Sequence, residues 1–207
     1  MTSIGLNFTT AALYALIALA AWLPIISHTS GSVEPAGRLA LLRGAYVAAL
    51  LAHGTALGYS LFDGDGLNIG FSHAVSLIIW LVMGAYFLIG FDNLLLKLVT
   101  MYLGPLAVAA ALLPVLLPAQ RIVHYAGFAF KLHFVVAILA YALFTVAALH
   151  ALLMLFLEKR LHAGTMPETL QGLPPLLRIE RLLFQLLSVA FLLLTATLVS
   201  GVFFSED

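Results

Sequence analysis

The 207-residue sequence contains no cysteine. This absence excludes disulfide bonds, thiol redox chemistry and metal sites built from thiolates. Charged residues are also scarce, because Asp, Glu, Lys and Arg make up 9% of the chain, against roughly one quarter in an ordinary soluble domain. Nine basic and nine acidic residues give a formal net charge of zero, so the charge balance indicates neither nucleic acid nor an acidic substrate as a partner.

Sequence patterns of several common catalytic sites are missing as well. There is no Ser-His-Asp spacing, no phosphate-binding glycine loop and no HExxH pattern, so the sequence does not predict an enzyme. A cleavable signal peptide begins with a positively charged region, whereas the opening "MTSIGLN" contains no Lys or Arg. We therefore expect the first apolar segment to be retained as a membrane helix.

Hydrophobic residues are abundant, at 63% of the chain, and they form successive runs of the length that a helix needs to cross a bilayer. The sequence predicts an all-α, polytopic transmembrane bundle, with residues 1–207 forming one integral-membrane domain surrounded by the lipid bilayer. The six predicted spans are Phe8–Ile26, Leu39–Leu61, Gly70–Gly90, Leu94–Leu117, Phe128–Leu157 and Leu176–Phe204. The "EKRLH" segment after the fifth span is expected to continue as helix into water.

Orientation follows from the positively charged residues, which are enriched in short cytoplasmic loops. Seven of the nine lie in or beside the connections after the first, third and fifth spans: Arg38, Arg43, Lys97, Lys159, Arg160, Arg178 and Arg181. These connections are therefore predicted to be cytoplasmic, and both termini periplasmic.

Four of the seven histidines fall on the predicted outer side or in the outer half of the membrane: His53, His73, His124 and His133. Ionisable residues inside spans are rare, face the bundle interior and are often functional. Imidazoles from different helices, without thiolates or nearby carboxylates, suit axial ligation of haem iron better than a zinc or di-iron centre. The alternative is that each histidine only hydrogen-bonds to a neighbouring helix. His28 and His162 are expected to be solvated loop residues, and His150 an interfacial one.

The segment "HYAGFAFKLHFVV" contains two of these histidines, His124 and His133. On one continuous helix their rings would lie on opposite faces, ~13–14 Å apart along the axis. Either the chain turns at Gly127, or each histidine serves a different partner. Small residues near His53 and His133 allow close helix packing, and they would also leave space for a flat ligand.

Three segments resemble the cytochrome c assembly protein family, in its HemX-like and YpjD-like branch related to CcsA and CcmC. They are "LLAHGTAL", "LHFVVAILAYALFTVAALHALL" and "LPPLLRIERLLFQLLSVAFLLLTATLVSGVFF". The resemblance implies a multi-pass protein of the bacterial inner membrane, in which histidines hold haem b for delivery to apocytochrome c, with other cytochrome c assembly proteins as partners. His53 and His133 match histidines of the branch in the second and fifth spans. His124 lies where the outer loop often has a histidine, and His73 has no matched position.

Two features depart from the family pattern. The CcsA and CcmC relatives present haem on a tryptophan-rich outer loop, whereas Trp22 and Trp80 here are isolated and lie in predicted spans. The sequence also stops at "FFSED", where family members usually continue through two more helices. We therefore expect a protein that binds or hands over haem, with His53 and His133 as axial ligands, without catalysing a covalent step.

A second hypothesis is a membrane accessory or regulator without haem. It would contact another protein through the cytoplasmic connection "EKRLHAGTMPETLQGLPPLLRIER". A third hypothesis is ion transport, but the predicted spans contain no pair of carboxylates that could serve it.

Overall fold

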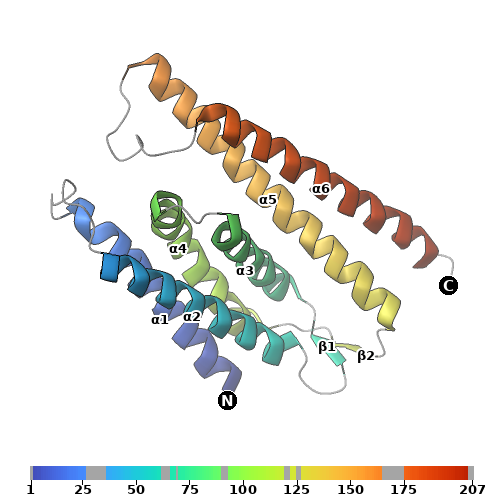
Figure 1. The fold of residues 1–207 in the computed structure, drawn as a ribbon. Coiled ribbons are helices and arrows are strands. Elements are labelled where there is room, and N and C mark those ends of the chain that lie inside the picture. The colour runs from blue at the N-terminus through green and yellow to red at the C-terminus, as the bar shows by residue number, and fades with distance from the viewer. Residues whose placement is uncertain are drawn as a thin grey trace. The chain divides into compact units, whose positions relative to one another are not determined.

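The computed structural model describes residues 2–26, 36–61, 66–68, 70–89, 93–118, 122–124, 127–164 and 175–204 (Figure 1). These described residues form six long helices and two short strands. The helices are α1 (Thr2–Ile26), α2 (Ala36–Leu61), α3 (Phe71–Ile89), α4 (Asn93–Leu116), α5 (Phe128–His162) and α6 (Leu176–Phe204), and the strands are β1 (Gly66–Asn68) and β2 (Ile122–His124). The chain forms two compact units, Met1–Ala126 and Gly127–Asp207, which are described in turn.

The six helices are each long and apolar enough to cross a membrane, which confirms the predicted all-α transmembrane architecture. The sixth helix has the predicted bounds, and α5 runs through "EKRLH" to His162, as expected. The first helix begins earlier than predicted, at Thr2 instead of Phe8, because no proline interrupts the polar residues before the apolar run. The periplasmic placement of both termini stays a prediction.

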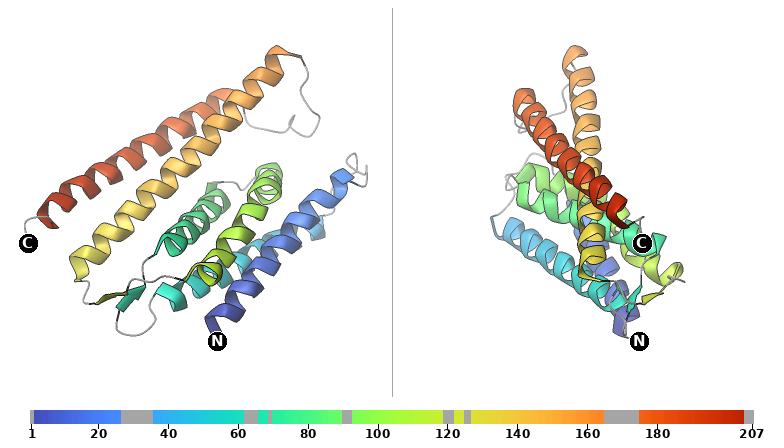
Figure 2. Two further views of the ribbon diagram at one scale, coloured as in Figure 1. Left: turned by 180° about the vertical axis from the view of Figure 1, so that it is seen from behind. Right: turned by 90° about the vertical axis from the view of Figure 1, so that its right-hand side faces the viewer.

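The first unit is a bundle of α1 to α4. Helix α1 contacts both α2 and α4, and α3 contacts the same two helices from the other side (Figure 2). Contact between α1 and α4 is close at Gly104, where an added Cβ would lie 2.8 Å from the Ala18 Cβ. Small residues let transmembrane helices approach in this way. Helix α4 also includes Pro105 and Pro114, which membrane helices tolerate better than soluble ones.

Strands β1 and β2 pair antiparallel and join the α2–α3 connection to the α4–α5 connection. Gly66 lies opposite His124, and Asn68 opposite Ile122. The sequence did not predict these strands, because three residues are too few to show the alternation of a strand. The pairing places the two connections at the same end of the first unit, in agreement with the predicted alternation of spans.

The second unit is an antiparallel pair of helices, α5 and α6 (Figure 1). After α5 come the C-cap Ala163 and then a left-handed glycine, Gly164 (φ 64°), the residue type that most easily adopts this conformation after a helix. Helix α6 begins after Pro175, whose carbonyl oxygen accepts a hydrogen bond of 2.8 Å from the Arg178 amide. Proline is favoured at the start of a helix, where its missing N–H would have no helical partner.

Candidate functional site

His53 is fully buried inside the first unit, where it joins three helices. Its Nε2 lies 2.9 Å from Ser76 Oγ on α3, and its Nδ1 lies 3.4 Å from the Tyr14 hydroxyl on α1. The Tyr14 ring meets the imidazole edge-on, with 5.7 Å between centroids. In either tautomer one ring nitrogen donates and the other accepts, so His53 has hydrogen-bonding partners on both sides.

The small residues beside His53 are used for helix packing. At Gly54 an added Cβ would lie 2.8 Å from Trp80 Cζ2, so the indole occupies the space that a larger side chain would need. Trp80 Nε1 donates a 2.8 Å hydrogen bond to the Leu50 carbonyl oxygen on α2. Of the two interpretations offered for the small residues of the second span, close packing is the one observed at Gly54.

His73 lies close to the start of α3 and is buried. Its neighbour Ser72 donates a 2.6 Å hydrogen bond to the Leu117 carbonyl oxygen at the end of α4, and Ser72 Oγ lies 3.4 Å from His73 Nδ1. Since residues three apart share a helix face, His73 lies one turn from Ser76, the partner of His53. His53 and His73 therefore belong to one polar region of the first unit.

His133 lies on α5 in the second unit and is half-buried against α6. Its Nδ1 is 2.8 Å from Ser200 Oγ, and Ser200 donates its only hydroxyl proton to the Thr197 carbonyl oxygen at 3.0 Å. In the tautomer that carries its proton on Nδ1, His133 donates to Ser200 Oγ, and Nε2 is the unprotonated ring nitrogen. A Cβ added at Gly201 would be 3.5 Å from His133 Cε1, so the ring lies over a glycine. Metal-ligating histidines usually donate their other ring N–H in this way.

His124 lies in β2, and its side chain is outside the described residues. Helix α5 begins only at Phe128, with Gly127 as its N-cap, so His124 and His133 are not on one helix. Both alternatives, a turn at Gly127 and separate partners for the two histidines, stay predictions. The structure therefore brings His53 and His73 together in one unit and places His133 in the other.

His150 was predicted to be an interfacial side chain, but the structure buries it against other residues. It is 3% exposed, and its Nδ1 donates to the Val146 carbonyl oxygen at 3.0 Å. The helical spacing of Val146, His150 and Leu157, all buried, puts the three on one stripe of α5. That spacing was the signal in the sequence that the interfacial interpretation missed. His162, in contrast, is exposed as predicted, and His28 lies outside the described residues.

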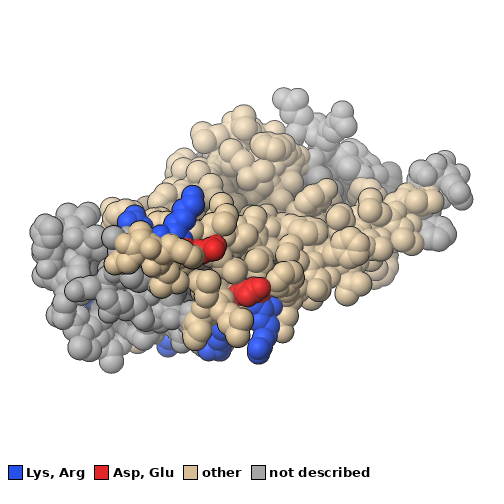
Figure 3. Space-filling model, turned by 90° about the horizontal axis from the view of Figure 1, so that it is seen from above, with Lys and Arg blue, Asp and Glu red and all other residues tan. Residues whose placement is uncertain are grey.

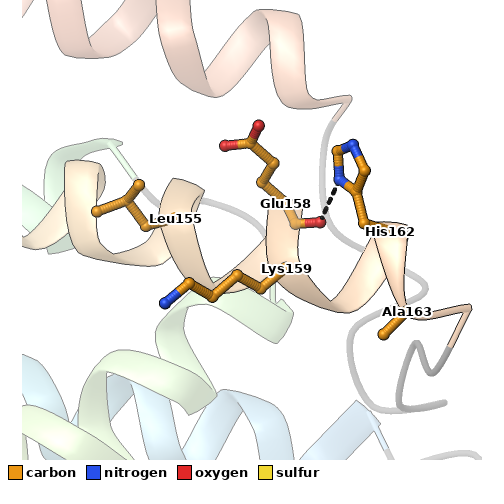
Figure 4. Close-up of a pocket in the computed structure, with 5 residues that line it drawn as sticks. All are labelled: Leu155, Glu158, Lys159, His162 and Ala163. Atoms are coloured by element: carbon orange, nitrogen blue, oxygen red, sulfur yellow. Dashed lines mark hydrogen bonds between the residues drawn. The ribbon is translucent and has the colours of Figure 1, made fainter.

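A pocket of about 550 Å³ lies at the end of α5 (Figure 4). It is lined by Leu155, Glu158, Lys159, His162 and Ala163. The Glu158 and Lys159 side chains leave the helix on different sides, while His162 Nδ1 donates to the Glu158 carbonyl oxygen at 2.9 Å. Arg160 stacks over Phe156 at 5.1 Å in the same segment. In the space-filling view, the acidic side chains that are visible have basic ones nearby (Figure 3).

Within the described part of the chain, no three His, Asp or Glu residues lie close enough to hold a metal ion. Haem needs only one or two axial side chains, because the porphyrin supplies the other ligands. The Nδ1–H bond of His133 fits such a role, whereas ligation through Nε2 of His53 would replace its hydrogen bond to Ser76.

The sequence profile of the family described as "Cytochrome C assembly protein" matches residues 43–207. The chain belongs to the cytochrome c assembly protein family. The match includes His53, His73, His124 and His133, and it supports a role in cytochrome c biogenesis.

Curated relatives agree with this family. The chain is 29% identical over 205 residues to "Inner membrane protein YpjD" of Escherichia coli K12 and to the same protein of strain O157:H7, covering 95% of this chain and 74% of theirs. With six helices able to span a bilayer, this cytochrome c assembly family member is a multi-pass protein of the inner membrane. No solved structure matches the chain.

Proposed function

We propose that this protein binds haem b within the membrane and holds it or hands it over during cytochrome c biogenesis. His133 is the axial ligand that its surroundings support best. The observation that carries this proposal is the 2.8 Å hydrogen bond between His133 Nδ1 and Ser200 Oγ, which orients the ring as the outer partner of a ligating histidine does. Haem itself supplies the iron and the porphyrin, and the protein supplies ligation, orientation and an apolar surround.

His53, in the first unit, is the other candidate axial ligand that the sequence indicates, with His73 and His124 as further candidates. Ligation by His53 requires that its Nε2 exchange the Ser76 hydroxyl for iron, while the Tyr14 hydroxyl stays beside Nδ1. His53 and Ser76 are both fully buried, so ligation would also require the helices around them to separate and admit the porphyrin. Apocytochrome c and other assembly proteins are the proposed recipients.

The test is an absorption spectrum of protein expressed with ample haem and purified in detergent. We expect a Soret band that is strongly weakened in His133→Ala and in His53→Ala, and unchanged in the control His162→Ala, which alters an exposed histidine of the same helix as His133. Size-exclusion chromatography of each variant separates a lost ligand from a lost fold. A haem-free preparation that takes up no haem on titration would contradict the proposal.

A second candidate is an accessory protein that contacts a partner through the connection between α5 and α6. The pocket at the end of α5, with its charged lining, favours this alternative. Binding of a purified assembly protein that is lost in Glu158→Lys, and kept in both His133→Ala and His53→Ala, would support it over haem binding.

A further inference from the structure

Thr10, on α1, is fully buried, and its Oγ1 has no hydrogen-bonding partner. It is the only buried side-chain nitrogen or oxygen in this condition among the residues that the structure describes. A buried hydroxyl without a partner loses its hydrogen bonds to water and gains none in return. In a membrane interior the loss is not relieved by bulk water.

Other threonines of the described helices donate a hydrogen bond to a carbonyl oxygen of their own helix. Thr9 donates to the Gly5 carbonyl oxygen at 2.9 Å, and Thr55 donates to that of Leu51 at 2.7 Å. Thr145, Thr195 and Thr197 also bond four residues back along their own helices. Such back-bonding is the usual choice of a helical threonine. Thr10 does not make this bond, although its adjacent residue does.

Thr10 lies in a polar stripe on the buried face of α1. Asn7 precedes it by three positions and Tyr14 follows it by four, and both are buried. The Tyr14 hydroxyl is 3.4 Å from His53 Nδ1, a long contact, and His53 Nε2 continues to Ser76 Oγ at 2.9 Å. The partnerless hydroxyl therefore lies one helical turn from a chain of polar groups that joins α1, α2 and α3.

We propose that a water molecule is bound at Thr10 and links its hydroxyl to the Tyr14–His53–Ser76 chain. Water fits because it can donate and accept, and buried waters typically make about three hydrogen bonds to polar groups that are otherwise unsatisfied. Because the Tyr14–His53 contact is long, at 3.4 Å, the tyrosine hydroxyl can also hydrogen-bond to this water. The water then connects Thr10 to His53 through the Tyr14 hydroxyl, whether or not haem is present.

The experiment is water-edited solid-state NMR of the full chain in lipid vesicles, with threonine and histidine isotopically labelled. Magnetisation should pass from water to Thr10 and His53 several times faster than to buried apolar residues of α1. Thr10→Val, which removes the hydroxyl at nearly constant volume, should slow transfer to His53 severalfold. Thr10→Ser keeps the hydroxyl and should retain the transfer, as should the matched control Thr9→Val, which alters the exposed neighbour.

Wild-type protein alone can overturn the proposal, since slow transfer to Thr10 would show a dry site. Thermal unfolding in detergent gives an independent result. A dry, partnerless hydroxyl predicts that Thr10→Val raises the unfolding midpoint, whereas a bound water predicts an unchanged or lower one. Neither readout requires haem, so failure of the haem proposal leaves this test intact.

Discussion

Ser200 Oγ lies 2.8 Å from His133 Nδ1, although 67 positions separate the two residues in sequence. This hydrogen bond joins α5 to α6 and orients the imidazole ring. It therefore serves both the packing of the second unit and the proposed ligation of haem.

Removing the Ser200 hydroxyl should weaken haem binding. Without it the imidazole loses its orienting acceptor, and loss of such outer partners typically lowers metal affinity about 10- to 100-fold. We expect Ser200→Ala to raise the Kd for haem in a Soret titration by about that factor. Ser188→Ala is the matched control, because Ser188 is exposed on the same helix and donates only to Phe184. Equal affinities in the two variants would contradict an orienting role for Ser200.

The same pair should also contribute to stability. Hydrogen bonds between transmembrane helices average about 0.6 kcal/mol in double-mutant cycles, with a maximum near 1.7 kcal/mol. We expect a coupling free energy in this range between His133→Ala and Ser200→Ala, measured by reversible unfolding in detergent without haem. Additive effects of the two substitutions would show that the bond does not stabilise the unit.

Gly104→Ala should destabilise the first unit. The new methyl group would lie 2.8 Å from the Ala18 Cβ, and neither atom belongs to a flexible side chain that could move away. Overpacking of this kind costs about 1–3 kcal/mol, so the unfolding midpoint should fall. Gly58→Ala is the control, because a Cβ at Gly58 would meet nothing within 4 Å. Similar midpoints for both variants would show that α1 and α4 separate easily.

Gly54→Ala should displace the Trp80 indole. The added Cβ would lie 2.8 Å from Cζ2, and the shift that relieves this contact would weaken the 2.8 Å hydrogen bond from Nε1 to Leu50. We expect an altered Trp80 emission maximum in a Trp22→Phe background, where Trp80 is the only tryptophan left. Gly84→Ala, on the same helix as Trp80, should leave the emission unchanged. An unshifted spectrum in Gly54→Ala would contradict the close α2–α3 contact.

Tyr46→Phe should cost about 1 kcal/mol of stability, the usual net value of one buried hydrogen bond. The Tyr46 hydroxyl donates to the Met83 carbonyl oxygen at 2.9 Å, while its ring stacks on Phe87 and would stay there in the variant. Tyr59→Phe, at an exposed position of the same helix, should be neutral. A neutral effect of Tyr46→Phe would mean that water or another group replaces the lost donor.

The positions of the helices could be predicted from the sequence because a run of apolar residues long enough to cross a bilayer has few other structures. The burial of His53 and His73 followed from the same argument, since ionisable side chains avoid lipid. Their partners could not be predicted. Ser76, Tyr14 and Ser200 depend on how each helix is rotated about its axis, and helices that are apolar on every side carry little information about rotation.

The short strands and the buried His150 were missed for different physical reasons. The β1–β2 ladder is held by backbone hydrogen bonds between distant connections, which leave no side-chain pattern to read. His150 lies on a stripe shared with Val146, but the stripe is weak against the apolar background of α5. The sequence pattern showed the helices, and the contacts between them required the structure.

The contact between α1 and α4 has a consequence for biosynthesis. Helix α1 leaves the ribosome before α4, and the surface that receives Ala18 at Gly104 is made only after α2 and α3. Until α4 is inserted, Ala18 on α1 has no Gly104 to pack against, and β1 has no β2 to pair with. The first unit can therefore close only when its fourth helix has been inserted, and a chain halted after α3 should be a ready target for membrane quality-control proteases.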